Sequence, residues 1–135
     1  GRRLVLFFYP KDDTPGCTIE NKDFSALAAE FEGAGVALLG VSKDPPKKHL
    51  KFAARHGLVA PLASDPEESG KAERYGTWIE KSMYGRTYMG MERTTYLVGP
   101  DGGIEQVWRK VKVNGHAEAV LAAAKAAASN ESSTS

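Results

Sequence analysis

The only cysteine of the chain, Cys17, stands where a nucleophilic thiolate could form. The apolar run of residues 4–9 stops at Pro10, and a short polar loop then leads into a predicted helix. Thr14 is placed as the helix N-cap and Pro15 as the first helical residue, so Cys17 falls in the first turn, where backbone amides have no intrahelical partner. Those amides and the positive end of the helix dipole favour a negatively charged sulfur. The sequence therefore predicts a reactive thiolate.

The elements that hold this cysteine begin with a strand, a helix and a second strand. Residues 4–9 and 36–41 are continuous apolar runs, typical of strands buried on both faces, and residues 18–32 have helical apolar spacing. Such a unit joins two parallel strands through a right-handed connection. The later patterns predict a helix from Asp44 to Gly57, a short strand at 62–64, a short helix at 68–75, an irregular connection at 76–92, a β-hairpin at 94–108 and a helix at 117–128. This order predicts an α/β fold, a mixed central sheet with helices on both faces.

Length and charge limit the classes of function. The 135 residues suit one domain, predicted over residues 1–128, followed by a polar tail at 129–135 that we expect to be disordered. A formal net charge of +1 gives no field that would favour nucleic acid or an anionic membrane. No signal peptide or membrane span is seen, and a single cysteine fits a reducing compartment, so a cytoplasmic protein is expected.

The segment from Pro10 to Cys17 reads P-K-D-D-T-P-G-C and matches the P-x-x-x-T-x-x-C signature of peroxiredoxins. Residues 7–20 most resemble the branch called bacterioferritin comigratory protein or peroxiredoxin Q, and the likeness continues in order to residues 92–97. This resemblance implies a thioredoxin-like fold and the reduction of hydrogen peroxide and organic hydroperoxides. It implies no metal and no cofactor.

The resemblance also implies roles for single residues. Cys17 is expected to be the peroxidatic cysteine, Thr14 a hydroxyl that contacts thiolate and peroxide, and Pro10 a shield for the loop. Arg93, which cannot lose its proton, is expected to stabilise the thiolate and the departing oxygen. Amides near Gly16 are expected to add donors. In addition, Glu20, one helical turn after the cysteine, is expected to orient Arg93.

The chain departs from the family pattern at Lys22. Many members of the branch carry a second, resolving cysteine at this position, five residues after the first. A sulfenic acid on Cys17 is therefore expected to be resolved by an external thiol: thioredoxin, glutaredoxin or glutathione. The resemblance implies a monomer or weak homodimer. Members of the family usually have a short extended segment before the first core strand, and this sequence opens directly at that strand.

Two rival functions remain open on the sequence. A thiol-disulfide oxidoreductase normally needs Cys-x-x-Cys, and Glu20 stands where the second cysteine would be. A non-catalytic redox sensor or chaperone-like interaction protein, switched by oxidation of Cys17, is distinguished by a lack of turnover with a reductant. The other polar residues receive structural interpretations: Asp12 and Asp13 as a solvated turn, and His49, His56 and His116 as surface or capping residues.

Overall fold

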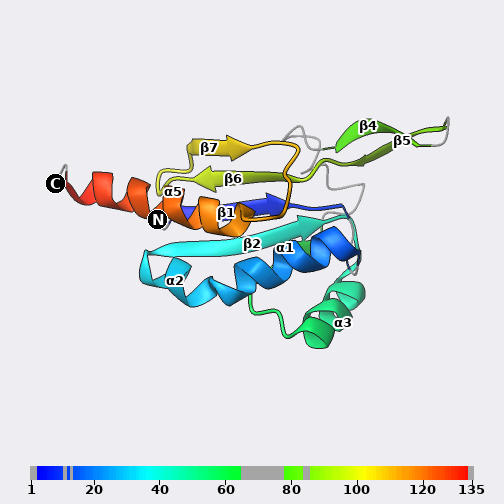
Figure 1. The fold of residues 1–135 in the computed structure, drawn as a ribbon, viewed down its shortest axis with the longest axis horizontal. Helices are drawn as coiled ribbons and strands as arrows, with labels where there is room; N and C mark the ends of the chain where they lie inside the picture. Colours follow the sequence, from blue (N-terminus) through cyan, green and yellow to red (C-terminus); the bar gives the residue numbers. More distant parts are fainter. Residues whose placement is uncertain (1–2, 11, 13, 65–77, 84–85, 134–135) are drawn as a thin grey trace.

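A five-stranded mixed sheet forms the centre of the computed structural model, which describes residues 3–10, 12, 14–64, 78–83 and 86–133 (Figure 1). From one edge to the other, the strands are β3 (Leu62–Ser64), β2 (Val36–Ser42), β1 (Arg3–Phe8), β6 (Thr94–Val98) and β7 (Ile104–Trp108). β1 pairs in parallel with β2 and antiparallel with β6. Because β1 is the central strand, the residue that follows its last residue lies near the middle of the sheet, at the end where β1 stops.

The connection between β1 and β2 is helical, as the sequence predicts, but it is divided into two helices. α1 (Pro15–Ala26) ends at Leu27, whose N–H donates to the carbonyls of Asp23 and Phe24, and α2 (Ala28–Gly33) follows at once. Gly35, with φ of 77°, then turns the chain into β2, a backbone angle that favours glycine. α1 therefore starts beside the end of β1 and carries Cys17 in its first turn.

The segment after β2 also follows the predicted pattern. α3 (Pro46–His56) ends at Gly57, which has φ of 62° in the left-handed region, and β3 then pairs in parallel with β2. α3 lies near the end of the sheet from which α1 begins (Figure 1). This arrangement brings side chains of α3 close to the loop before Cys17.

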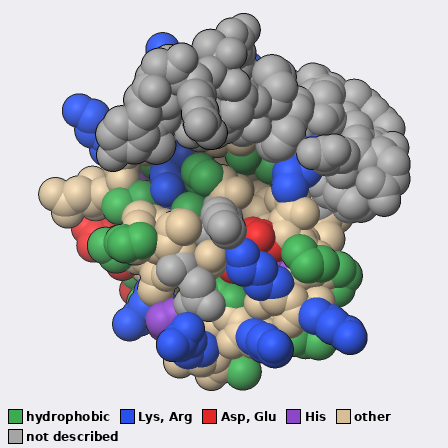
Figure 2. Space-filling view, turned by 90° about the vertical axis from the view of Figure 1, so that its right-hand side faces the viewer, with side chains coloured by type: hydrophobic (Ala, Val, Ile, Leu, Met, Phe, Trp, Pro, Cys, Tyr) green, Lys and Arg blue, Asp and Glu red, His purple; other side chains and the backbone are tan. Residues whose placement is uncertain are grey.

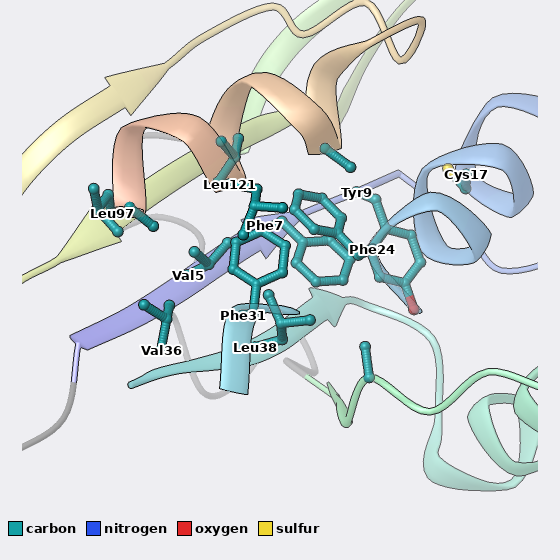
Figure 3. Packing of buried hydrophobic residues seen from close by; sticks show 14 of the residues in the cluster. Val5, Phe7, Tyr9, Cys17, Phe24, Phe31, Val36, Leu38, Leu97 and Leu121 are labelled. Carbon is teal, nitrogen blue, oxygen red and sulfur yellow. The ribbon is translucent and has the colours of Figure 1, made fainter. Parts of the chain in front are cut away.

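Two apolar clusters lie on opposite faces of the sheet, because successive side chains of β1 alternate. One cluster contains Val5 and Phe7 with side chains of α1, α2, α3 and the C-terminal helix α5 (His116–Ser133). Within it, Phe7 stacks on Phe24 with ring centroids 4.4 Å apart (Figure 3). The other cluster contains Leu6 and Phe8 with side chains of β2 and β6. Cys17 belongs to the first cluster, so α1 is fixed against the sheet by the same core that holds the thiol.

The C-terminal part has the predicted hairpin and closing helix. β6 and β7 are antiparallel, with a register shift between Leu97 and Val98. α5 (His116–Ser133) crosses in front of β1 and packs on α1 and α2 (Figure 1). It continues five residues past Ala128, the end that the sequence predicts, so the first part of the expected tail is helical here; the disorder of residues 129–135 stays a prediction. No helix in the described ranges is long and apolar enough to cross a bilayer.

The prediction of an irregular connection at 76–92 is wrong for most of that segment. β4 (Trp78–Met83) and β5 (Arg86–Met91) form a separate two-stranded antiparallel sheet that extends from one end of the main sheet (Figure 1). A ribbon that joins no larger sheet need not bury one regular face, so alternation of apolar residues does not mark it. The helix predicted at 68–75 lies outside the described residues.

Candidate active site

The sulfur of Cys17 lies against a guanidinium group. Nη2 of Arg93, the residue just before β6, donates a hydrogen bond to Cys17 Sγ at 3.3 Å. Cys17 comes from the first turn of α1, and both residues lie at the end of the sheet where β1 ends and β6 begins, although they are 76 positions apart in the chain. The sulfur thus has a positively charged group at hydrogen-bond distance.

The second end of the same guanidinium binds Glu20. Nη1 of Arg93 donates to Glu20 Oε1 at 2.8 Å, and the Glu20 side chain is only 1 % exposed. The other carboxylate oxygen, Oε2, is buried and has no hydrogen-bond partner among the residues that the structure describes. Glu20 lies three residues after Cys17, so one turn of helix carries both groups that Arg93 contacts.

The charges in this group shift one another's protonation equilibria. Burial raises the pKa of Glu20 to about 7, although Arg93 acts in the opposite direction. Burial alone would lower the pKa of Arg93, but the charges of Glu20 and Cys17 raise it, so the guanidinium stays charged. His116, whose Nε2 shares a hydrogen bond of 2.8 Å with Thr95 Oγ1, has a pKa lowered to about 4 by burial and by the charge of Arg93.

The start of α1 has the predicted geometry. Thr14 is the N-cap residue, with φ of −84° and ψ of 152°, and Pro15 is in the first turn. The Thr14 side chain does not make the capping hydrogen bond that the sequence suggests. The first backbone bond of the helix runs from Thr18 N–H to Thr14 O at 2.9 Å, so the N–H groups of Gly16 and Cys17 precede the helical ladder.

Two further predicted residues lie in the same region. A Cβ atom on Gly16 would be 3.0 Å from Arg93 Nη2, so the guanidinium passes directly over this glycine. Pro10 follows the end of β1 and is half-buried. The structure thus brings Cys17, Arg93, Glu20 and Gly16 into one cluster, with Thr14 at the start of the same helix.

The thiol is enclosed in this conformation. Cys17 is 0 % exposed, and Asn21 Nδ2, one turn later, donates to its backbone carbonyl at 2.9 Å. A peroxide therefore reaches the sulfur only when neighbouring atoms move aside.

The interpretation of Asp12 and His49 as solvated or surface residues is wrong. Asp12 is 2 % exposed and His49 6 % exposed, and His49 Nδ1 lies 2.6 Å from Asp12 Oδ2. His116 is also buried, at the start of α5. The sequence signal for Asp12 and His49 is weak, because a contact between residues 37 positions apart follows no local periodicity.

Figure 2 views the end of the molecule at which β1 ends and α1 begins. Lys and Arg side chains gather over the lower half of this face, where α3 lies. α3 contains Lys47, Lys48, Lys51 and Arg55 and no acidic residue. The end of the molecule that carries the thiol is therefore positively charged on its α3 side.

Comparison with known proteins gives one consistent family. Residues 1–107 match the AhpC/TSA family. Peroxiredoxin Bcp of Xanthomonas campestris is 52 % identical over 126 residues, which cover 93 % of this chain and 78 % of that protein. Peroxiredoxin Bcp of Bacillus subtilis is 42 % identical over 121 residues, with coverage of 90 % and 76 %.

Solved structures agree in fold. The X. campestris bacterioferritin comigratory protein, described for its alkyl peroxide reduction activity, superposes with a TM-score of 0.87 at 51 % identity, over 95 % of this chain and 81 % of that one. A PrxQ mutant of Xylella fastidiosa gives 0.89 at 44 % identity, with coverage of 94 % and 78 %. The predicted thioredoxin-like, mixed-sheet fold is confirmed. Structures of the X. campestris peroxiredoxin Q include serine variants at two different cysteines, whereas the present sequence contains one.

Proposed function

Because the chain belongs to the AhpC/TSA family as a Bcp/PrxQ peroxiredoxin, a thiol-dependent peroxidase, we propose that Cys17 is the sulfur that reacts with the peroxide. The observation that carries this proposal is the hydrogen bond of 3.3 Å from Arg93 Nη2 to Cys17 Sγ. No other cysteine is present in the 135 residues. The single cysteine fits a one-cysteine variant of the branch.

The reaction assigns each group a step. The thiolate of Cys17 attacks one peroxide oxygen, the O–O bond breaks, and the sulfur is oxidised to a sulfenic acid. The second oxygen leaves with the bonding electron pair as hydroxide or alkoxide and takes up a proton to give water or an alcohol. Arg93, kept charged by its carboxylate partner Glu20, stabilises the negative charge first on sulfur and then on the departing oxygen.

The start of α1 supplies the remaining groups. The N–H groups of Gly16 and Cys17, which lie ahead of the helical ladder, are donors for the peroxide oxygens. The hydroxyl of Thr14 contacts thiolate and peroxide, and Pro10 shields the loop from water. Glu20 acts through Arg93 and is a positioning residue. Hydrogen peroxide and organic hydroperoxides are the proposed substrates, a class supported by the alkyl peroxide reduction of the Xanthomonas relative.

The sulfenic acid returns to the thiol at the expense of an external thiol. One thiol condenses with the sulfenic acid to give a mixed disulfide and water, and a second thiol attacks that disulfide and releases Cys17. Thioredoxin, glutaredoxin and glutathione are the proposed reductants, in a reducing compartment such as the cytoplasm. We also propose that residues 1–128 act as one domain, as a monomer or weak homodimer, without nucleic-acid or membrane partners.

The test is the rate of sulfenic acid formation, followed by intact mass after hydrogen peroxide is mixed with reduced protein. We expect one added oxygen in the wild type, none in Cys17→Ser, and a rate lower by about 100-fold in Arg93→Ala. Arg109→Ala is the matched control, because Arg109 binds the hydroxyl of Tyr96 and Glu92 instead of the thiol, and it should react as the wild type does. An unchanged rate in Arg93→Ala would remove this residue from the mechanism.

A second assay separates a peroxidase from a redox sensor. Peroxide consumption is measured in parallel with thioredoxin, glutaredoxin and glutathione as reductants. Multiple turnovers with at least one of them are expected, and the preferred reductant is then read directly. A single equivalent of peroxide consumed with all three would contradict recycling by these thiols.

A further inference from the structure

We propose that Asp12 is a positioning residue: with Tyr9 and His49 it anchors the loop before α1, and so holds the Cys17 sulfur against Arg93. This inference rests on the proposed function of Cys17 and adds a group of residues that the peroxide chemistry does not itself use. In the sequence, Asp12 precedes Thr14, and the thiol of Cys17 follows it. The anchor joins the end of β1, the loop and α3.

The side chain of Asp12 is held at both carboxylate oxygens. Tyr9 O–H donates to Oδ1 at 2.6 Å, and His49 Nδ1 donates to Oδ2 at 2.6 Å. Asp12 is 2 % exposed, and its two partners are also buried. Charge-assisted hydrogen bonds of this length in a buried site are among the stronger polar contacts in proteins. Burial, and secondarily the neighbouring Asp12, raises the pKa of Tyr9, so its hydroxyl keeps the proton that it donates.

The ring of His49 faces an acceptor at each nitrogen. Besides Asp12 at Nδ1, its Nε2 lies 3.1 Å from the carbonyl oxygen of Ala63 in β3. The ring of His49 on α3 therefore lies between Asp12 of the loop and Ala63 of β3, with a polar contact at each nitrogen.

The backbone of Asp12 is fixed by a second set of contacts. Its N–H donates to Asp44 Oδ2 at 2.8 Å. The same Asp44 oxygen accepts the hydroxyl of Ser42 at 2.7 Å, and Lys48 Nζ lies 3.0 Å from Asp44 Oδ1. Burial would raise the pKa of Asp44, but these hydrogen bonds and the charge of Lys48 hold it below its usual value, so it remains an anionic acceptor. The loop is thus attached to the end of β2 and to α3 at one residue.

Arg93 and Cys17, which meet at the site, are held in place by different contacts. The backbone of Arg93 is held from outside the loop, because its carbonyl accepts the N–H of Val111 at 2.9 Å, whereas its guanidinium is held by Glu20 of α1. Cys17 is five residues beyond Asp12 at the start of α1. If the loop is released at Asp12, the first turn of α1 loses this attachment and Cys17 Sγ can shift relative to Arg93 Nη2. A displacement of about 1 Å at reacting groups can lower a rate by about 100-fold.

The experiment compares Asp12→Ala with Asp12→Asn. Alanine removes both side-chain hydrogen bonds. Asparagine has the same shape and keeps both: its Oδ1 accepts from Tyr9, and its Nδ2 donates to a neutral His49, whose Nε2–H still donates to Ala63. The matched control pair is Asp101→Ala and Asp101→Asn, in the exposed turn between β6 and β7, where Asp101 bonds only within its own turn in the described contacts.

Two rates are measured on reduced protein at a temperature at which circular dichroism shows every variant folded. They are the rate of sulfenic acid formation with hydrogen peroxide and the rate of Cys17 alkylation by iodoacetamide, which reports opening of the enclosed thiol. Asp12→Ala is expected to react with peroxide about 10- to 100-fold more slowly and to be alkylated faster. Asp12→Asn should restore both rates to within about threefold of the wild type, because its hydrogen bonds are retained.

The outcomes separate this inference from the proposed function. A wild type that forms sulfenic acid, together with an Asp12→Ala variant that matches it in both rates, overturns the anchor and leaves the function of Cys17 intact. Failure of Asp12→Asn to restore the rates also overturns it, because the loss is then not one of hydrogen bonding. A wild type that forms no sulfenic acid refutes the proposed function, while the alkylation rates still test the anchor.

Discussion

At the scale of single residues, the site depends on how one guanidinium is divided between two acceptors. Arg93 uses Nη2 for Cys17 and Nη1 for Glu20, and it can reach both because the acceptors are one helical turn apart. Gly16 leaves the space through which the guanidinium reaches the sulfur. The absence of a side chain at Gly16 therefore allows a positive charge to lie next to the sulfur.

We expect Gly16→Ala to slow the peroxide reaction without loss of fold. The new Cβ would lie 3.0 Å from Nη2 and 3.7 Å from Cζ of Arg93, so the guanidinium must shift by a few tenths of an ångström from the position in which it contacts the sulfur. The rate of sulfenic acid formation should fall about tenfold, while the melting temperature stays within a few degrees of the wild type. Stopped-flow kinetics and thermal unfolding measure the two quantities.

The control for this substitution is Gly33→Ala. Gly33 ends α2, and a Cβ there meets no atom within 4 Å. It should leave the peroxide rate unchanged. If Gly16→Ala reacts as fast as Gly33→Ala, the position of Nη2 has no influence on the thiol.

At the scale of elements, the position of the thiol depends on the packing of β2 between β1 and β3, because this packing places the aromatic side chain that holds α1. Gly40 of β2 pairs with Phe7 of β1 on one side and with Leu62 of β3 on the other. Side chains from both neighbours close over it, and Phe7 continues into the stack with Phe24 of α1 (Figure 3). The absence of a side chain at Gly40 thus allows the aromatic contact that ties α1 to the sheet.

Gly40→Ala is predicted to destabilise the domain. Its Cβ would lie 2.7 Å from two atoms of the Phe7 ring and 2.9 Å from Leu62 Cδ2, which forces the buried ring to move. Overpacking of this kind costs about 1–3 kcal/mol. The free energy of unfolding in urea measures the loss, and equal stability of Gly40→Ala and Gly33→Ala would contradict the role given to this close approach.

The sequence predicts the elements whose signals are local. The parallel pair β1 and β2, α3 with its terminal Gly57 and the hairpin of β6 and β7 all follow from apolar runs, capping residues and turn residues. The break at Leu27 and the ribbon of β4 and β5 leave no such pattern. At the site, the contacts of Cys17 with Arg93 and of Arg93 with Glu20 agree with the expected arrangement. The buried contact between Asp12 and His49 cannot be predicted from local sequence patterns, because it depends on where α3 packs.

At the scale of the whole molecule, Arg93 links two buried titrating groups that act on stability with opposite signs. Glu20, with a pKa raised from 4.5 to about 7, binds more protons in the folded state, so its contribution to stability falls as the pH rises through this range. His116, with a pKa lowered from 6.5 to about 4, binds fewer protons in the folded state, so its contribution rises as the pH increases from about 4 to 6.5. We therefore expect the two contributions to offset each other in part in the wild type between about pH 4.5 and 6.5.

Removing either group should therefore leave the pH dependence of stability that the other group causes. Glu20→Gln is expected to lose stability as the pH falls from 6.5 to 4, and His116→Gln to lose stability as the pH rises from 4.5 to 7, each by at most roughly 3 kcal/mol. Urea unfolding at half-unit steps of pH measures both curves, and the wild type should be flatter than either variant. A titration of the His116 ring protons by NMR checks the cause directly. A midpoint near 6.5 in the folded protein would show that the pKa of His116 is not lowered, and His116 could then not account for the expected change of stability between pH 4 and 6.5. Parallel curves for the wild type and both variants would mean that neither buried group controls the response to pH, and the cluster around Arg93 would then act on the thiol alone.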